Sequence, residues 1–285
     1  MLEAKSGRKG KKRREERMAD WLGLDGRVAV VTGAGGGLGR AISRVLASAG
    51  ARVVLLDRDL AACEETASVV GGVAQCLRCD VTDPEDVASA ADETARAHGA
   101  ADILVNNAGL LRPGPIATLT LEEWNRLLSV NLTGYFLCAK AFGRQMLSRQ
   151  RGAVVHVASI AGRHPQPWSG AYSVSKAGVV MLSQQLAVEW GPSGVRSNVV
   201  SPGLVRTPMS EPFYRIPEVL ERRSEIVPLR RVAAPDDIAD VVAYLVSDRA
   251  RYVNGEDLCV DGGFGRVLMG LVPRPGFEAR DPAEG

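Results

Sequence analysis

Three side chains stand at spacings that suit proton transfer to or from a substrate oxygen. Tyr172 and Lys176 are four residues apart within the predicted helix Ala171–Trp190, so they share one helix face. A tyrosine with a reference pKa of about 10 is a weak base near neutral pH, and a fixed ammonium group beside it favours the phenolate. Ser159 precedes Tyr172 by thirteen positions, and its hydroxyl can hydrogen-bond a substrate oxygen. These residue types predict general acid–base chemistry at a hydroxyl or carbonyl group.

A glycine-rich turn predicts a dinucleotide site. The predicted strand Arg27–Thr32 runs into Gly33-Ala34-Gly35-Gly36-Gly37-Leu38-Gly39, and a predicted helix follows. Glycines in such a turn allow a tight bend, a close approach to a pyrophosphate and close helix–strand packing, while the helix N-terminus offers N–H groups to the phosphates. The alternative is a merely flexible loop. The helix that follows, and an acidic residue at the end of the next strand, favour the dinucleotide site.

That acidic residue, Asp57, also predicts which dinucleotide binds. Its carboxylate can accept hydrogen bonds from the adenosine ribose hydroxyls. A 2′-phosphate in the same place would meet like charge, at a cost of about 4 kcal/mol per charge pair at about 4 Å and an effective dielectric near 20. The neighbouring Arg58 could offset part of this cost by turning toward a phosphate. The sequence therefore predicts NAD as cofactor, with NADP less favoured.

The elements that must position these residues alternate between strand and helix along the chain. Short, nearly continuous apolar runs predict strands at Arg27–Thr32, Arg52–Asp57, Val73–Cys79, Asp102–Asn106, Ala153–Ala158, Val195–Val200 and Asp257–Val260. Longer patterns predict helices at Leu38–Ala49, Pro84–His98, Leu121–Leu128, Thr133–Ser148, Ala171–Trp190 and Pro235–Val246. This alternation predicts an α/β fold: one doubly wound parallel sheet of about seven strands with helices on both faces. We expect a single domain over residues 18–264, with an irregular insertion at 208–227 that contains a short helical patch.

Charge is distributed unevenly along the chain. Residues 1–17 carry eight of the 35 Lys and Arg residues and three of the 33 Asp and Glu residues, which leaves 27 positive and 30 negative groups in the rest. We interpret residues 1–17 as a basic disordered tail, either non-native or a solvated arm, and residues 265–285 as a C-terminal tail. A functional basic arm is the remaining alternative. The slightly acidic body argues against nucleic-acid binding.

Further motifs complete a family pattern. Asn106-Asn107-Ala108-Gly109 and Ser201-Pro202-Gly203 join the glycine-rich turn, Ser159 and Tyr172-Ser173-Val174-Ser175-Lys176 in the order and spacing of the short-chain dehydrogenase/reductases. The chain resembles this family over roughly residues 24–264. The resemblance implies a Rossmann fold and an oxidoreductase that acts on CH–OH groups and interconverts a secondary alcohol and a ketone.

The resemblance also implies roles for individual residues. Tyr172 would act as the base, Ser159 would bind the substrate oxygen, Lys176 would also hold the nicotinamide ribose, and Asn131 would anchor a water of the proton relay. Further cofactor contacts are implied at Asp80, Val81, Asn107, Ala108, Gly109, Pro202, Gly203, Val205 and Thr207. His156 departs from the family, which often has Asn near this position, and we interpret it as a hydrogen-bonded structural side chain.

Two other functions stay open at this point. One is an NADPH-dependent 3-oxoacyl-thioester reductase, against which Asp57 argues. The other is a catalytically inactive dinucleotide-binding sensor or scaffold, which would have no need of a complete set of Ser, Tyr and Lys. We expect a small apolar or alicyclic substrate, because the predicted pocket walls are mainly apolar: Leu110, Leu111, Ile160, Ala161, Trp168, Leu204, Met209, Phe213 and Tyr214.

The cysteines and the hydropathy bear on compartment and assembly. Five scattered cysteines with no signal peptide predict a reducing, cytoplasmic compartment. No apolar run approaches the roughly 20 residues that cross a bilayer, so we expect no membrane association. Cys76 and Cys79 have a zinc-like spacing, but they lie on one predicted strand and face opposite sides, so we expect no metal site. Family resemblance implies a homotetramer, or a homodimer, that pairs through helices Thr133–Ser148 and Ala171–Trp190.

Overall fold

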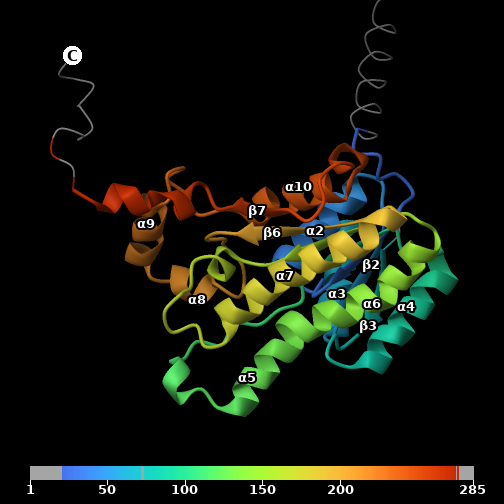
Figure 1. Ribbon diagram of the computed structural model, residues 1–285, viewed down its shortest axis with the longest axis horizontal. Coiled ribbons are helices and arrows are strands. Elements are labelled where there is room, and N and C mark those ends of the chain that lie inside the picture. The colour runs from blue at the N-terminus through green and yellow to red at the C-terminus, as the bar shows by residue number, and fades with distance from the viewer. Residues whose placement is uncertain (1–20, 72–73, 274, 276–285) are drawn as a thin grey trace, which may run out of the picture.

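Seven strands form one sheet in the order β3-β2-β1-β4-β5-β6-β7, and every neighbouring pair runs parallel (Figure 1). This computed structural model describes residues 21–71, 74–273 and 275, so the basic tail predicted at 1–17 lies outside the described residues. The strands are β1 (Val28–Thr32), β2 (Arg52–Asp57), β3 (Ala74–Arg78), β4 (Ile103–Asn106), β5 (Gly152–Val157), β6 (Val195–Pro202) and β7 (Asp257–Val260). The predicted doubly wound sheet is confirmed.

The strand order reverses beside β1. The chain first builds outward from β1 to β3, then crosses back so that β4 pairs with the other edge of β1. Loops leaving the carboxyl ends of β1 and β4 therefore run in opposite directions and open a crevice between them. The glycine-rich turn follows β1 and Asn107 follows β4, so the topology brings both predicted cofactor segments to this crevice.

Helices cover both faces of the sheet (Figure 1). The helices are α2 (Gly37–Ser48), α3 (Leu60–Val70), α4 (Pro84–His98), α5 (Leu121–Leu128), α6 (Gly134–Ser148), α7 (Tyr172–Trp190), α8 (Glu211–Tyr214), α9 (Pro217–Ile226) and α10 (Pro235–Val246). Shorter turns are 3-10 helices at Ile116–Thr118, Ile160–Gly162, Gly191–Ser193, Asp248–Ala250 and Phe264–Leu271, and a π-helical turn at Ser129–Thr133. In the described residues, no helix is both long and apolar enough to cross a bilayer.

Successive residues of the central strand β1 pack alternately into two separate hydrophobic cores, one on each face of the sheet. Ala29 and Val31 of β1 belong to the cluster that α2 and α10 cover, whereas Val28 and Val30 belong to the cluster that α4 and α6 cover. All four side chains are at most 1% exposed. Burial on both faces explains why these strands read as continuous apolar runs in the sequence.

Three stretches differ from the prediction. Helix α3 was not predicted; Asp59 caps its N-terminus by accepting a hydrogen bond from the Ala62 N–H (3.1 Å). The insertion expected to be irregular, at 208–227, contains α8 and α9, each with a proline in its first turn. The predicted C-terminal tail begins inside the 3-10 helix Phe264–Leu271.

Candidate active site

A cavity of about 750 Å³ lies at the carboxyl ends of the strands. Its lining includes Asp57 at the end of β2, Ser159 after β5, and Tyr172 and Lys176 in the first turns of α7. The structure thus brings the three reactive side chains and the predicted cofactor carboxylate into one cavity. The other predicted cofactor residues that line it are Gly33, Gly36, Gly37, Leu38, Arg58, Asp80, Val81, Asn107, Ala108, Gly109, Pro202, Gly203, Val205 and Thr207.

The glycine-rich turn is closely packed where glycine is required. Gly33 has φ of +63°, and a Cβ there would lie 2.7 Å from the Ala108 Cα. A Cβ on Gly39 would lie 2.1 Å from the Gly33 carbonyl oxygen, so any larger residue would push α2 off β1. Gly35 and Gly39 do not line the cavity. Their part is to allow this packing, while the other glycines present backbone to a ligand.

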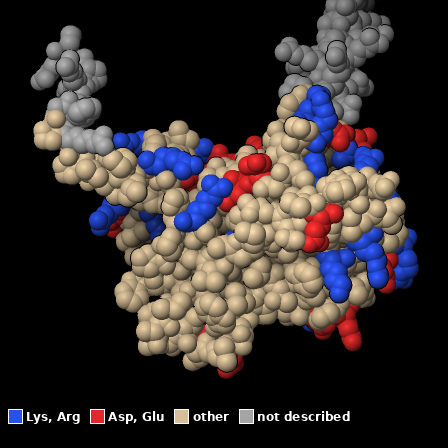
Figure 2. All heavy atoms as spheres, viewed as in Figure 1, with Lys and Arg blue, Asp and Glu red and all other residues tan. Residues whose placement is uncertain are grey.

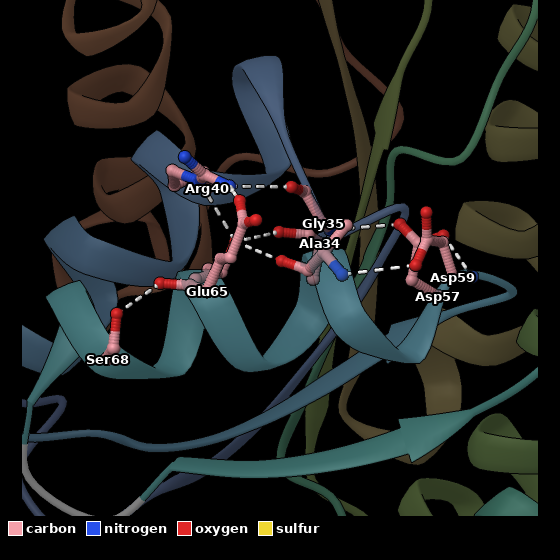
Figure 3. A network of polar contacts seen from close by, with 9 residues as sticks. Ala34, Gly35, Arg40, Asp57, Asp59, Glu65 and Ser68 are labelled. Atoms are coloured by element: carbon pink, nitrogen blue, oxygen red, sulfur yellow. Dashed lines mark hydrogen bonds and ion pairs between the residues drawn. The ribbon is translucent and has the colours of Figure 1, made fainter.

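Two backbone N–H groups hold the Asp57 carboxylate against the glycine-rich turn (Figure 3). Its Oδ2 accepts a hydrogen bond from the Gly35 N–H at 2.9 Å, and its Oδ1 accepts one from the Asp59 N–H at 3.1 Å. Arg40, directly after the turn, donates to the Gly35 carbonyl at 3.0 Å and pairs with Glu65 of α3 at 3.3 Å. The Arg40 guanidinium is therefore already engaged, and the carboxylate stands fixed at the cavity edge.

Lys176 is almost fully buried, at 4% exposure. Its Nζ donates to the Val157 carbonyl at 2.9 Å and to the Tyr135 hydroxyl at 3.4 Å. A Cβ built on Gly109 would lie 3.7 Å from Nζ, so the glycine of the β4 motif leaves this side of the ammonium group open. Burial lowers the pKa of Lys176 to about 7.

The phenol of Tyr172 behaves differently from what the sequence suggests. Burial raises its pKa, and contact with the Ser159 hydroxyl acts in the opposite direction. We expected the Lys176 ammonium group to lower this pKa. Instead, Nζ lies 5.8 Å from the centre of the Tyr172 ring and turns toward β5 and Tyr135. Ser159 contacts the phenol and favours its phenolate, while an effect of Lys176 on this pKa stays a prediction.

Asn131 lies in the π-helical turn between α5 and α6 and is fully buried. Its amide nitrogen donates to the Leu110 carbonyl (2.9 Å) and to the Ser175 hydroxyl (3.2 Å), and its oxygen accepts from the Leu110 N–H (2.9 Å). The side chain therefore ties the loop after β4 to α7 and does not line the cavity. A role in a water relay stays a prediction.

The comparisons with known proteins agree with this geometry. A family model described as enoyl-(acyl carrier protein) reductase matches residues 33–265. D-threitol dehydrogenase from Mycolicibacterium smegmatis is 41% identical over 244 residues, which are 85% of this chain and 94% of that protein. The chain belongs to the short-chain dehydrogenase/reductase family. It is an oxidoreductase acting on CH–OH groups, and it interconverts a secondary alcohol and a ketone.

Other relatives extend the comparison. Cis-4-hydroxycyclohexanecarboxylate dehydrogenase from Sinomonas cyclohexanicum is 40% identical over 85% of this chain and 97% of that protein. The crystal structure of a short-chain type dehydrogenase/reductase from Mycobacterium marinum has a TM-score of 0.81 and 35% identity, covering 86% of this chain and 98% of that one. Two further solved structures, at 37% and 36% identity, hold bound NADP. The choice between NAD and NADP in this dehydrogenase/reductase therefore rests on its own residues.

The predicted substrate walls are correct in part. Six of the nine line the cavity: Leu110, Leu111, Leu204, Met209, Phe213 and Tyr214. Ile160, Ala161 and Trp168 do not line it. The first two belong to the 3-10 turn that packs along α7, where Gly162 meets the Lys176 backbone, and Trp168 is 71% exposed on the loop before α7.

Sequence reasoning missed a buried cluster behind Lys176. The Tyr135 hydroxyl donates to the Val157 carbonyl at 3.0 Å, and its ring stacks on His156 with 5.9 Å between ring centres. His156 Nδ1 lies 3.2 Å from the Asn106 amide nitrogen, so it accepts that hydrogen bond and the ring proton belongs on Nε2. Nε2 has no hydrogen-bond partner among the described residues. His156 is thus a structural side chain, as predicted, and it supports the tyrosine that contacts Lys176.

This burial predicts a specific acid sensitivity. Burial lowers the pKa of His156 to about 3, whereas an imidazole in the unfolded chain titrates near about 6.5. Below pH of about 6.5 the unfolded chain binds a proton that the folded chain does not, so the free energy of unfolding falls by up to about 1.4 kcal/mol per pH unit. Denaturant unfolding at pH values between about 5 and about 7 should show a shallower loss for His156→Asn than for the unmodified protein.

The matched control is His164→Asn, since His164 is exposed in the loop before α7. Its unfolding should keep the pH dependence of the unmodified protein. If His156→Asn and His164→Asn lost stability equally steeply with acid, the buried imidazole would not be the source of the sensitivity.

Proposed function

We propose that the enzyme oxidises a small apolar or alicyclic secondary alcohol with NAD, using Tyr172 as the proton acceptor. The observation that carries this proposal is the meeting of Ser159, Tyr172 and Lys176 with the fixed Asp57 carboxylate in one cavity. The nicotinamide ring of the dinucleotide supplies the hydride acceptor. Gly33, Gly36 and Gly37 would present backbone to its pyrophosphate, and Asp57 would accept from its ribose hydroxyls.

Ser159, Tyr172 and Lys176 would each have a separate role in binding the substrate and moving its proton. Ser159 Oγ, at the start of the 3-10 turn Ile160–Gly162, would donate a hydrogen bond to the substrate oxygen and so hold it near the phenol. Tyr172 would take the hydroxyl proton during oxidation and return it during reduction. In its protonated form, Lys176 would bring one positive charge to the site, and the residues it contacts do not neutralise that charge, because Val157 and Tyr135 offer uncharged oxygens. The apolar walls exclude water from the reacting atoms.

Cofactor choice is expected to depend on Asp57. The kcat/KM for NAD should exceed that for NADP at least tenfold, because a 2′-phosphate would have to approach a carboxylate that two backbone N–H groups hold in place. Asp57→Ser should reduce the preference. Initial rates with each cofactor at fixed alcohol concentration measure both values. Equal use of NAD and NADP by the unmodified enzyme would contradict the proposal.

We further propose that the enzyme is a homotetramer, with a homodimer as the smaller alternative. Large apolar side chains are exposed along α6 and α7, including Phe136, Val174, Met181 and Val188. Figure 2 shows that the face over α5, α6 and α7 carries few charged residues. Most of the charged residues in this view lie toward its other edges. Leu268, Met269 and Leu271 add a second exposed apolar surface in the last 3-10 helix.

Light scattering of the purified enzyme at micromolar concentration tests this assembly. We expect a mass near four times 30.3 kDa. Met181→Asp should shift the mass downward, because it places a charge in the middle of the exposed face of α7. A monomeric mass for the unmodified enzyme would contradict the assembly.

A cytoplasmic location is proposed from the cysteines, since all five have free thiols.

A further inference from the structure

An arginine of the segment over the cavity has no acidic partner. Arg223 of α9 is half-buried and lines the cavity. Its guanidinium carbon lies 5.0 Å from the centre of the Phe213 ring and 5.1 Å from the centre of the Tyr214 ring. Among the described residues it makes no hydrogen bond and no ion pair through its side chain. The two rings are its neighbours, and they too line the cavity.

Two arginines that flank this segment in the chain have acidic partners. Arg206 pairs with Glu211 at 3.0 Å, and Arg231 pairs with Asp237 through two hydrogen bonds, of 2.6 and 2.8 Å. Neither Arg206 nor Arg231 lines the cavity. Arg223 is the charged residue that the stretch from 208 to 227 adds to the cavity lining.

Stacking on aromatic rings prepares a guanidinium group for an anion. The faces of Phe213 and Tyr214 attract the cation and restrict its plane, while the N–H groups at its edge stay available. A carboxylate accepts two parallel hydrogen bonds from such an edge. The position also fits a substrate rather than the cofactor's adenosine end: α8 and α9 lie at the end of the molecule opposite β2 and β3, and Asp57 ends β2 (Figure 1).

We propose that Arg223 binds a carboxylate carried by the substrate at a distance from the reacting hydroxyl. This inference rests on the proposed function and narrows its substrate class to small hydroxy acids with an apolar or alicyclic body. Leu204, Met209 and Phe213 would contact that body, and Ser159 and Tyr172 would contact its hydroxyl. Arg223 is thus a specificity-determining residue.

The test compares an acid with its uncharged analogue. With NAD saturating, kcat/KM is measured for cis-4-hydroxycyclohexanecarboxylate and for the corresponding carboxamide. We expect at least a tenfold preference for the acid in the unmodified enzyme, mostly through KM. Arg223→Met should reduce the ratio of acid to amide at least tenfold, and Arg223→Lys should keep part of it. In a third arm, kcat/KM for a sulfonate analogue shows whether the site is specific for a planar carboxylate or accepts any anion.

Arg222→Met is the matched control, because Arg222 is the exposed neighbour on α9 and does not line the cavity. It removes the same charge and should keep the acid-to-amide ratio of the unmodified enzyme. Equal kcat/KM for acid and amide, or an acid preference that Arg223→Met leaves unchanged, would overturn this inference while the proposed function stands. No turnover of any secondary alcohol would overturn the proposed function itself.

Discussion

Tyr172→Phe is expected to lower kcat at least 1000-fold, which corresponds to about 4 kcal/mol in the activation barrier. The substitution removes one oxygen from a half-buried ring and keeps the ring itself. That oxygen contacts the Ser159 hydroxyl in the cavity, and we propose that it exchanges a proton with the substrate. Steady-state rates at saturating alcohol and cofactor measure the effect. Tyr252→Phe is the control, since Tyr252 is fully exposed.

The direction of the Tyr172 pKa adds a second signature. Because burial raises the pKa of Tyr172, little phenolate is present near neutral pH. The phenolate, which oxidation needs, becomes more populated as pH rises toward that pKa. Oxidation of the alcohol should therefore accelerate with increasing pH in the unmodified enzyme. Reduction of the ketone uses the protonated phenol and should keep its rate near neutral pH. A Tyr172→Phe enzyme that kept a tenth of the normal kcat would remove Tyr172 from the proton transfer.

Lys176→Arg is expected to fold normally and to lose at least 100-fold in kcat, about 2.7 kcal/mol. The compact ammonium group reaches both the Val157 carbonyl and the Tyr135 hydroxyl in a buried position. A planar guanidinium fork is broader and cannot take the same position without moving Tyr135 or β5. Composition supports the distinction, because 25 of the 27 Lys and Arg residues after Arg17 are arginine and Lys176 is one of two exceptions.

The other exception supplies the matched control. Lys140 is exposed on α6, and Lys140→Arg should keep both kcat and KM. Circular dichroism and thermal melting should show that Lys176→Arg is folded before its rates are compared. Turnover within a few-fold of the unmodified enzyme at neutral pH would mean that the position needs a charge but no particular shape.

The fold was predictable from the sequence because burial on both faces leaves a strong pattern. Strands β1, β4 and β5 are runs of Val, Ile, Leu and Ala, and the glycines and prolines at their ends separate them clearly from the helices. Helix α3 was missed because its apolar residues do not gather on one face of the helix. It lies at the edge of the sheet, where part of its surface is exposed to solvent. The helical content at 211–226 was underestimated, as one short patch, because three prolines suggested an irregular chain.

The site was predictable only where a residue acts within a motif. Asp57, Ser159, Tyr172 and Lys176 stand at fixed distances along the chain from recognisable turns, and the structure places all four in the cavity. Tyr135 and Arg223 belong to no such pattern. Tyr135 reaches Lys176 across 41 positions of sequence. Arg223 is identified by the two rings it stacks on and by making no ion pair with any described residue. Such contacts arise from packing, which spacing along the chain does not encode.

The most direct test is the initial rate of nicotinamide reduction with a panel of secondary alcohols, run with NAD and NADP in parallel. The panel should include an alicyclic alcohol, an alicyclic hydroxy acid and a polyol. We predict reduction of NAD by the alicyclic members, at least tenfold slower reduction of NADP, and rates near background for Tyr172→Phe. Reduction that depended on neither Tyr172 nor the choice of dinucleotide, or no reduction with any alcohol, would contradict the assignment of this cavity as an NAD-dependent alcohol dehydrogenase site.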